Sequence, residues 1–156
     1  QDYADKFGCE FFPKQKPWGQ KVDICMPAAY QNELDVPEIE QIIANGTKYY
    51  IEVANMPTTN EGLACAMAEP GMIVAPSKAV NAGGVAVSAL EMAQNSMRYS
   101  WDGAEVDAKL VGIMKNIHKI SVEAAEGAGL GYNLVAGANI AGFKKVAAAM
   151  MAQGLV

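Results

Sequence analysis

The sequence is short of basic residues and of histidine. Its 156 residues include 12 Lys or Arg against 17 Asp or Glu, which gives a formal net charge of −5, and His118 is the single histidine. Proteins that bind phosphate backbones cluster Lys and Arg on one face, and no such cluster occurs here, so we expect no nucleic-acid partner. His118 has no Cys or carboxylate at metal-ligand spacing. We therefore predict no metal site and expect His118 to be a surface or half-buried structural residue.

Cysteine is also scarce, and its pattern argues against a disulfide framework. Cys9, Cys25 and Cys65 are odd in number and form no C-x-x-C motif, which suits reduced thiols in the cytosol. None lies near a histidine or an obvious cationic neighbour along the sequence. We therefore expect no cysteine nucleophile.

Long apolar runs are the third absence. No run approaches the roughly 20 residues that a membrane span requires, and no charged and then apolar leader opens the chain. We expect a cytoplasmic protein that has no membrane partner.

The composition is otherwise that of a globular protein, and the sequence begins abruptly. Apolar residues make up 51% of the chain and 15 residues are glycine; this length is about one domain's worth, enough for a real core. The chain begins at Gln1 in what has the pattern of the last turns of a helix, which Gly8 ends. We interpret the chain as cut from a larger protein.

Strand and helix patterns alternate along the first 80 residues. Pro37 is typical of a first helical residue and predicts a helix to about residue 44. Thr58 with Glu61 forms a capping-box pattern and predicts a helix to about residue 68. The predicted strands are 10–12, 22–26, 48–53 and 72–74. This alternation is the signature of a parallel α/β sheet.

Helices are expected to fill the rest of the chain. Gly83 and Gly84 open one helix, Asp102 with Glu105 caps a second, and a last helix runs from about 133 to 153. The fold class is therefore α/β. We predict the carboxyl-terminal half of a doubly wound parallel sheet in residues 1–80, followed by long carboxyl-terminal helices in residues 81–156.

Two further motifs favour structural roles. The run Gly127-Ala128-Gly129-Leu130-Gly131 resembles a dinucleotide loop, but it follows a helix and Tyr132 stands where the last glycine belongs. We predict a turn between helices. The acidic run over residues 33–40 is predicted to be a solvated helix start whose charges suit the helix dipole.

Asn55 and Asn81 are candidates for a binding site. Each follows a predicted strand and precedes a helix, so both are expected at the carboxyl edge of the sheet, where ligands bind in open α/β folds. A loop asparagine often only forms a turn or a cap. Its amide is also donor and acceptor at once and so matches a nicotinamide carboxamide. The pattern alone leaves both interpretations open.

Three neighbours of Asn81 also have both a structural and a functional interpretation. Val85 and Ser88 lie three residues apart and share one helix face. They are either core residues or the apolar wall and the hydroxyl of a site. Lys78 is either a surface lysine or part of that site.

Four stretches together carry a family resemblance that covers almost the whole chain in order. They are Pro27-Ala28-Ala29-Tyr30-Gln31-Asn32-Glu33-Leu34, Val53-Ala54-Asn55-Met56-Pro57-Thr58-Thr59, Ala75-Pro76-Ser77-Lys78-Ala79-Val80-Asn81-Ala82-Gly83-Gly84-Val85 and Gly137-Ala138-Asn139-Ile140-Ala141-Gly142-Phe143. With them the chain closely resembles the carboxyl-terminal part of bacterial hexameric glutamate dehydrogenases, within the Glu/Leu/Phe/Val dehydrogenase family.

The resemblance implies that residues 1–80 are part of a Rossmann-like dinucleotide-binding domain. It places Asn81 on the carboxamide of the nicotinamide of NAD or NADP, and Asn55 near the nicotinamide ribose and the substrate. It places Ala28 and Ala29 where backbone meets the adenosine side. The family often has Cys-Ala-Thr at this point, so Ala28 and Tyr30 depart from its pattern.

The resemblance also implies a substrate pocket and an activity. Val85 and Ser88 match positions that line the pocket for the glutamate side chain, where a hydroxyl can meet the distal carboxylate. The implied reaction interconverts L-glutamate with 2-oxoglutarate and ammonium by hydride transfer to nicotinamide, in a full-length homo-hexamer. The family's catalytic lysines and aspartate match no residue of this chain, so no catalytic residue is assigned and the chain alone is expected to be inactive.

Two rival functions stay open from the sequence. One is a related leucine, phenylalanine or valine dehydrogenase, against which Ser88 argues because a buried hydroxyl beside an aliphatic side chain lacks a partner. The other is a non-catalytic binding or assembly module derived from the same fold.

Overall fold

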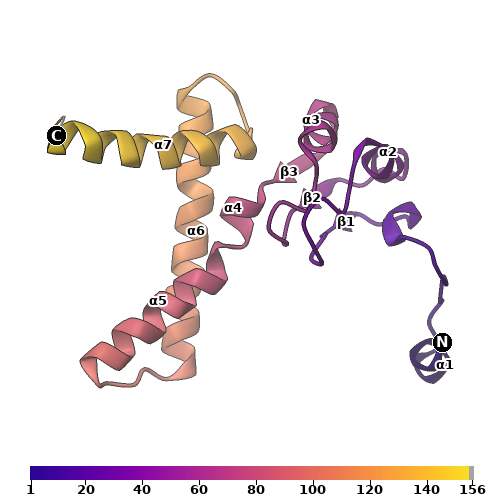
Figure 1. The fold of residues 1–156 in the computed structure, drawn as a ribbon, viewed down its shortest axis with the longest axis horizontal. Coiled ribbons are helices and arrows are strands. Elements are labelled where there is room, and N and C mark those ends of the chain that lie inside the picture. The colour runs from indigo at the N-terminus through magenta and orange to yellow at the C-terminus, as the bar shows by residue number, and fades with distance from the viewer. Residues whose placement is uncertain (155–156) are drawn as a thin grey trace.

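A parallel three-stranded sheet forms the centre of the amino-terminal half. The computed structural model describes residues 1–154. Within them the sheet has the order β1-β2-β3, with both neighbouring pairs parallel (Figure 1). The strands are β1 (Ile24–Cys25), β2 (Tyr49–Ile51) and β3 (Ile73–Ala75). Three of the four predicted strands are confirmed, although each is shorter than or shifted from its predicted range.

Helices α2 (Val36–Ala44) and α3 (Asn60–Ala68) connect these strands and cover one face of the sheet. Crossovers between parallel strands are right-handed, so two successive crossovers in the same direction place both helices on the same side. The strand residues that face them, Cys25, Tyr50 and Val74, are buried. The core comprises Trp18, Cys25, Leu34, Ile39, Ile42, Tyr50, Ala66, Met72, Val74 and Val135.

The opposite face of the sheet is apolar and uncovered. Ile24 pairs with Tyr49, and Tyr49 pairs with Ile73, so the three side chains form one row across the strands. They are 51%, 42% and 38% exposed. A doubly wound sheet carries helices on both faces, and in the described part of the chain this sheet has them on one. The structure therefore confirms an α/β fold built as half of such a sheet.

The amino-terminal segment lies apart from the sheet. Helix α1 (Asp2–Phe7) ends at Gly8, whose φ of 66° gives the left-handed cap that a glycine favours. The predicted strand over residues 10–12 is wrong: these residues have no regular structure, and Phe11 and Phe12 are exposed. A strand needs a hydrogen-bonding neighbour, and this segment runs away from the sheet (Figure 1). The chain joins the core only at Trp18, in the 3-10 helix η1 (Pro17–Gly19).

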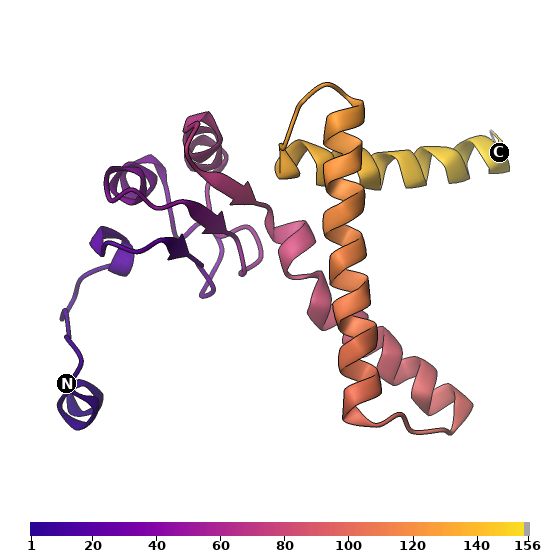
Figure 2. The same ribbon diagram turned by 180° about the vertical axis from the view of Figure 1, so that it is seen from behind.

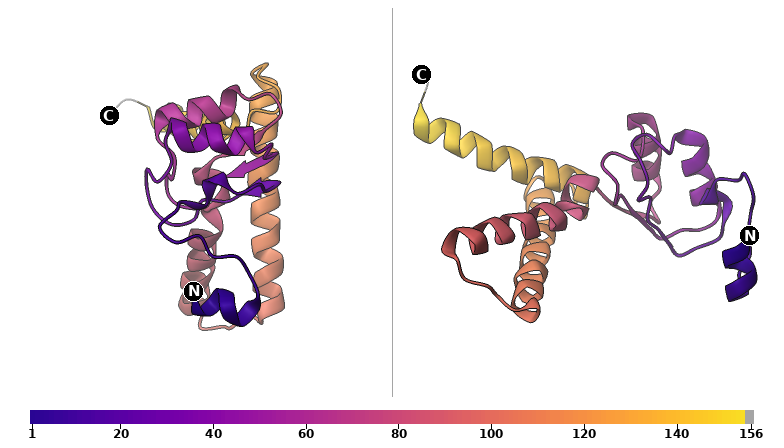
Figure 3. Two further views of the ribbon diagram at one scale, coloured as in Figure 1. Left: turned by 90° about the vertical axis from the view of Figure 1, so that its right-hand side faces the viewer. Right: turned by 60° about the horizontal axis from the view of Figure 1, so that its bottom comes forward.

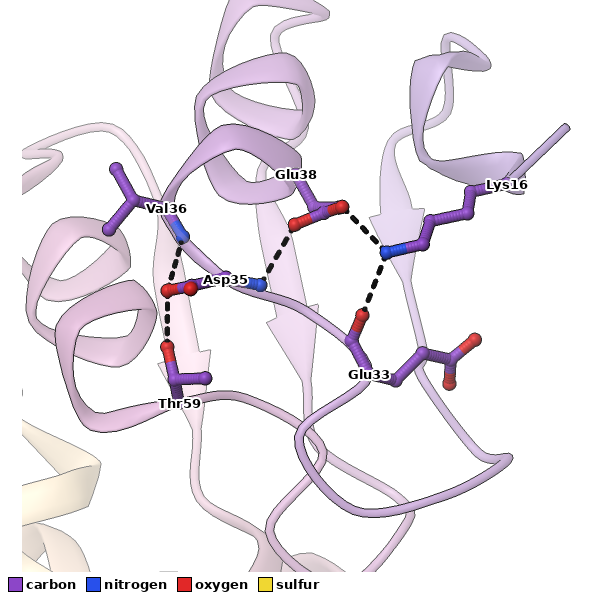
Figure 4. A network of polar contacts seen from close by, with 6 residues as sticks. All are labelled: Lys16, Glu33, Asp35, Val36, Glu38 and Thr59. Carbon is purple, nitrogen blue, oxygen red and sulfur yellow. Dashed lines mark hydrogen bonds and ion pairs between the residues drawn. The ribbon is translucent and has the colours of Figure 1, made fainter.

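A polar network fixes the start of α2. The Asp35 carboxylate caps the helix and accepts the Thr59 hydroxyl at 2.6 Å, while Glu38 completes the capping box and accepts the Lys16 ammonium at 2.7 Å (Figure 4). The bonds from Thr59 and the Val36 amide lower the pKa of Asp35. The bond from Lys16 lowers the pKa of Glu38. The acidic run is therefore a helix start, as predicted.

The cap of α3 lies one residue later than predicted. Thr59, not Thr58, accepts the Gly62 amide, at 3.1 Å. The Thr58 side chain is instead buried, and its hydroxyl lies 2.6 Å from the Tyr50 hydroxyl. A capping-box pattern identifies a helix start, but with two adjacent threonines it does not show which one is the cap. The structure decides this, because Thr58 is buried against the sheet and Thr59 is left to cap the helix.

Four helices form the carboxyl-terminal half as far as residue 154. They are α4 (Ser77–Val80), α5 (Ala82–Met97), α6 (Gly103–Gly127) and α7 (Leu134–Gln153). Helix α5 runs beside the first part of α6, and α7 crosses α6 near its end and continues well past it (Figures 2 and 3). The predicted caps are confirmed, because Asp102 accepts the Glu105 amide at 2.8 Å and Gly154 ends α7.

The glycine run is a turn between helices, as predicted. It connects α6 to α7, and Gly129 and Gly131 have positive φ values of 75° and 59°. These backbone conformations are ones that side chains rarely adopt. His118 lies beside this turn, exposed, with its Nε2 atom 2.7 Å from the Tyr132 hydroxyl.

Helix α7 overturns one sequence expectation. It is 20 residues long with a mean hydropathy of 1.2, so by length and composition it is able to cross a membrane, and 17% of that window is buried. The statement that no segment approaches this length was therefore wrong. Its centre carries Lys144 and Lys145, and charges at that depth of a bilayer are costly. The exposed apolar side chains of α7 are Phe143, Val146, Met150 and Met151.

The crossing of α6 and α7 depends on Gly137. A Cβ atom placed there lies 1.9 Å from the Ser121 carbonyl oxygen and 3.1 Å from the Ala125 Cβ atom. The two helices therefore approach as closely as they do only because α7 has no side chain at this point.

Gly137→Ala is expected to destabilise the chain by about 3 kcal/mol, because the methyl group forces two helix backbones apart. Gly142→Ala is the matched control, since a Cβ atom at Gly142 meets nothing within 4 Å. It is expected to stabilise the same helix by about 0.5–1 kcal/mol. Urea unfolding followed by circular dichroism measures both changes, and equal effects of the two substitutions would contradict the close crossing.

Burial also predicts how the thiols behave with pH. Burial raises the pKa of Cys25 from its ordinary 9.0 to about 11, whereas Cys9 is exposed. Cys9 is expected to react with a disulfide reagent on the order of 100-fold faster than Cys25, which needs local opening. Because the unfolded chain ionises Cys25 first, stability is lost as pH rises from 9.0 towards 11. If the Cys9→Ser variant still contains a thiol that reacts as fast as Cys9 does in the unmodified chain, and mass spectrometry assigns that thiol to Cys25, then the burial of Cys25 is contradicted.

Candidate functional site

Backbone hydrogen bonds join the loops that follow β1 and β2 at the carboxyl edge of the sheet. The amides of Val53 and Ala54 both donate to the Pro27 carbonyl, at 3.0 and 2.9 Å. Further along, the Asn32 amide donates to the Met56 carbonyl at 2.9 Å. Asn32 and Met56 both have positive φ values, 53° and 50°, which few residues other than glycine adopt. Backbone hydrogen bonds therefore fix the two loops to each other at this edge.

Glu52 joins β2 to the third loop. Its amide donates to the Ala75 carbonyl, and its carboxylate accepts the Ser77 amide, both at 3.0 Å. The residue is 3% exposed, so this charge-assisted bond lies in the interior, where such bonds are strong. The Ser77 amide is one of the unpaired donors at the start of α4. Glu52 thus fixes the point at which the chain leaves the sheet and enters the helical half.

Asn81 lies where α4 meets α5, and its amide is free. The residue ends α4 and precedes α5, with φ −89° and ψ 7°, and its side chain makes no capping bond to either helix. It is exposed, and no hydrogen bond from its amide to another side chain or backbone group is found within residues 1–154. The structure therefore contradicts a side-chain helix cap, whereas the turn interpretation stays open because Asn81 lies in a turn between the two helices.

Asn55, Ala28 and Ala29 lie on the two joined loops. All three are exposed, and Ala28 directly follows the fully buried Pro27. Asn55 sits in the bend between β2 and α3. The predicted cofactor residues are thus on the surface of the carboxyl edge, where their backbone and amide groups are accessible.

Val85 and Ser88 are not core residues. Val85 is 71% exposed and Ser88 is also exposed, so the core alternative is contradicted for both. The side of α5 that meets α6 is marked by Gly83, where a Cβ atom would lie 3.4 Å from Leu110 and 3.5 Å from Met114. Val85 and Ser88 therefore present an apolar group and a hydroxyl to the outside of α5, close along the chain to Asn81.

A cleft of about 570 Å³ opens at the same edge of the sheet. Its wall includes residues from all three loops and from α7: Asn32, Glu52, Thr59, Ser77, Lys78 and Asn139. The six predicted site residues do not line it. The predicted site is thus an open surface beside this cleft, and the buried Glu52 belongs to the cleft.

Two features of the site were missed by sequence reasoning. Glu52 directly follows the apolar strand 49–51, and a carboxylate in that place is a signal that was available. The second is the pairing of Lys78, whose ammonium donates to the Asn139 side chain on α7. The partners are 61 residues apart, and no local pattern pairs them.

Comparison with known proteins gives one consistent family. The family model described as Glutamate/Leucine/Phenylalanine/Valine dehydrogenase matches residues 1–154. The chain is 66% identical to the NAD-specific glutamate dehydrogenase of Clostridium symbiosum and 53% identical to the NADP-specific glutamate dehydrogenase of Escherichia coli (strain K12). In both cases the match covers 99% of this chain and 34% of the relative. The chain thus spans about a third of the length of these relatives.

A solved structure agrees with this. A glutamate dehydrogenase structure with 66% sequence identity superposes with a TM-score of 0.96, over 100% of this chain and 35% of that chain. The arrangement of the sheet, the loops at its carboxyl edge and the crossed helices is therefore shared with that structure.

Glu52→Ala is expected to destabilise the chain by about 2 kcal/mol, because it leaves the buried Ser77 amide without its charged acceptor. Glu52→Gln keeps an acceptor oxygen and is expected to cost about half as much. Glu91→Ala, at an exposed position of α5, is the control and is expected to stay within about 0.5 kcal/mol. Urea unfolding measures all three, and a Glu52→Ala variant as stable as Glu91→Ala contradicts the role given to this carboxylate.

Proposed function

The chain belongs to the Glutamate/Leucine/Phenylalanine/Valine dehydrogenase family, and on that premise we propose that it is part of an NAD(P)-dependent glutamate dehydrogenase. The proposed reaction is the oxidative deamination of L-glutamate to 2-oxoglutarate and ammonium. Bound NAD or NADP supplies the hydride chemistry, and the protein binds and orients it. The relatives named above are glutamate dehydrogenases of both cofactor preferences.

The free amide of Asn81 is the observation that carries this proposal. An asparagine between two helices usually caps the second one, and this one does not. Its amide offers a donor and an acceptor to the carboxamide of a nicotinamide ring, which has the same two groups. We propose that Asn55 meets the nicotinamide ribose, and that backbone at Ala28 and Ala29 meets the adenosine side.

Val85 and Ser88 are proposed as the substrate wall. Both are exposed on α5, so they are free to face a ligand. The hydroxyl of Ser88 suits the distal carboxylate of glutamate, whereas an aliphatic substrate would leave it unpaired. This favours glutamate over leucine, in agreement with the names of the relatives.

The proposal assigns the acid–base chemistry to the part of the enzyme that this chain does not span. Residues 1–80 are proposed as part of the dinucleotide-binding domain, and residues 81–156 as the helical segment that lines the cleft. We further propose a homo-hexamer for the whole protein. Its assembly or its remaining domain would cover the exposed apolar side chains of α7, such as Phe143 and Met150.

A hybrid enzyme tests this function. In it, the 156 residues replace the matching third of the Clostridium symbiosum enzyme, from which they differ at about a third of positions. The hybrid is expected to reduce 2-oxoglutarate with ammonium and NADH, with kcat/KM within about tenfold of the parent. Asn81→Ala in the hybrid is expected to lower kcat/KM by about 10- to 100-fold, because the cofactor loses its orientation.

Two controls make the result specific. Asn116→Ala, at an exposed position of α6, is expected to leave kcat/KM unchanged. The 156 residues alone are expected to have no turnover. A folded hybrid without activity would favour a non-catalytic module, and a hybrid that prefers leucine to glutamate would favour the related dehydrogenases.

A further inference from the structure

Helix α4 is too short to hold its own position. It has four residues, Ser77–Val80, and a single helical turn is unstable without outside contacts. Its last residue is followed by Asn81, so any shift of α4 moves the Asn81 amide. The position of this one turn therefore decides where the proposed nicotinamide contact lies.

Packing beneath α4 is incomplete. An apolar pocket of about 120 Å³, open to solvent, lies between Ala79 on α4 and Met114 and Ile117 on α6. Apolar groups on either side of an open pocket make fewer dispersion contacts than groups in a closely packed core. The apolar contacts with α6 thus leave α4 some freedom to move.

Two polar bonds hold the turn instead. At its first residue, the Ser77 amide is bound by the buried Glu52 carboxylate. One residue later, the Lys78 ammonium donates to the Asn139 side chain of α7. The first bond ties α4 to the sheet, and the second ties it to the helical half.

Asn139 is a rigid anchor. It lies two residues after Gly137, where α7 crosses α6 so closely that no Cβ atom fits, and Val135 in the same turn belongs to the core. A bond to Asn139 therefore ties the position of α4 to that of α7.

We propose that Lys78 and Asn139 form a clasp that positions Asn81 for the nicotinamide dinucleotide, so that both act as positioning residues. This inference rests on the proposed function. Both side chains are exposed, so the clasp contributes little to global stability. Loss of the clasp weakens cofactor binding instead, because part of the binding free energy is then used to place α4 correctly.

The test measures NADH binding to the hybrid enzyme by fluorescence titration. Lys78→Met and Asn139→Leu are each expected to raise the Kd for NADH by about threefold to tenfold, the range that a net hydrogen bond of about 0.7–1.4 kcal/mol corresponds to. The double variant is expected to bind no worse than either single one, because both remove the same link. Thermal unfolding is expected to stay unchanged in all three.

Two further variants separate positioning from general damage. Exchanging the partners, Lys78→Asn with Asn139→Lys, is expected to restore most of the affinity. Lys115→Met, at an exposed lysine of α6 for which no ion pair is found in residues 1–154, is expected to bind NADH normally.

The possible outcomes are distinct. If the unmodified hybrid does not bind NADH, the proposed function fails. If it binds and Lys78→Met binds equally well, or if the two single effects add, the clasp is refuted while the function stands.

Discussion

The hydrogen bonds at the carboxyl edge of the sheet are the constraint on which the rest of the structure depends. The strands have only two or three residues each, too few to define a rigid sheet by themselves. The ladder continues past them, through Pro27, which accepts two amides from the loop after β2, and through Glu52, which binds both Ala75 and Ser77. Because these bonds set the paths of three loops, they also set where every proposed ligand contact can lie.

The surfaces that this half of the fold leaves open follow from its topology. Two crossovers in one direction cover one face of the sheet, and the row formed by Ile24, Tyr49 and Ile73 stays exposed on the other. The outer half of α7 is equally uncovered. Rows of exposed apolar side chains are typical of surfaces that contact other protein, and the chain spans about a third of its relatives' length.

Local signals in the sequence predicted most of the helices, and long-range contacts account for what was missed. Gly8, Asp102 and Gly154 each mark a helix end through the backbone of their own neighbours, and each is confirmed. Pro37 marks the start of α2 to within one residue, because the helix begins at Val36. The wrong strand at 10–12 failed because a strand depends on a neighbour that the segment does not reach. The Lys78–Asn139 bond was out of reach for a related reason, since its partners meet only after α7 has crossed α6. The pattern alone makes Asn55, Asn81, Val85 and Ser88 candidates and leaves their roles open; the family resemblance assigns those roles and adds Ala28 and Ala29.

Asn81 breaks a local rule, and the reason lies in the two helices that it joins. A capping asparagine takes an extended backbone so that its side chain can turn back to the first amides of the helix. At Asn81 the backbone is close to helical, because α4 runs almost directly into α5, and the side chain cannot turn back. The chain thereby gives up about 1 kcal/mol of capping energy, and the next residues, Ala82, Gly83 and Gly84, add no side chain that could replace it. Natural sequences forgo such local stability mainly where function requires it. An uncapped helix start beside an unpaired side-chain amide is thus unfavourable unless a ligand forms hydrogen bonds with both. A nicotinamide carboxamide has the donor and the acceptor to do so.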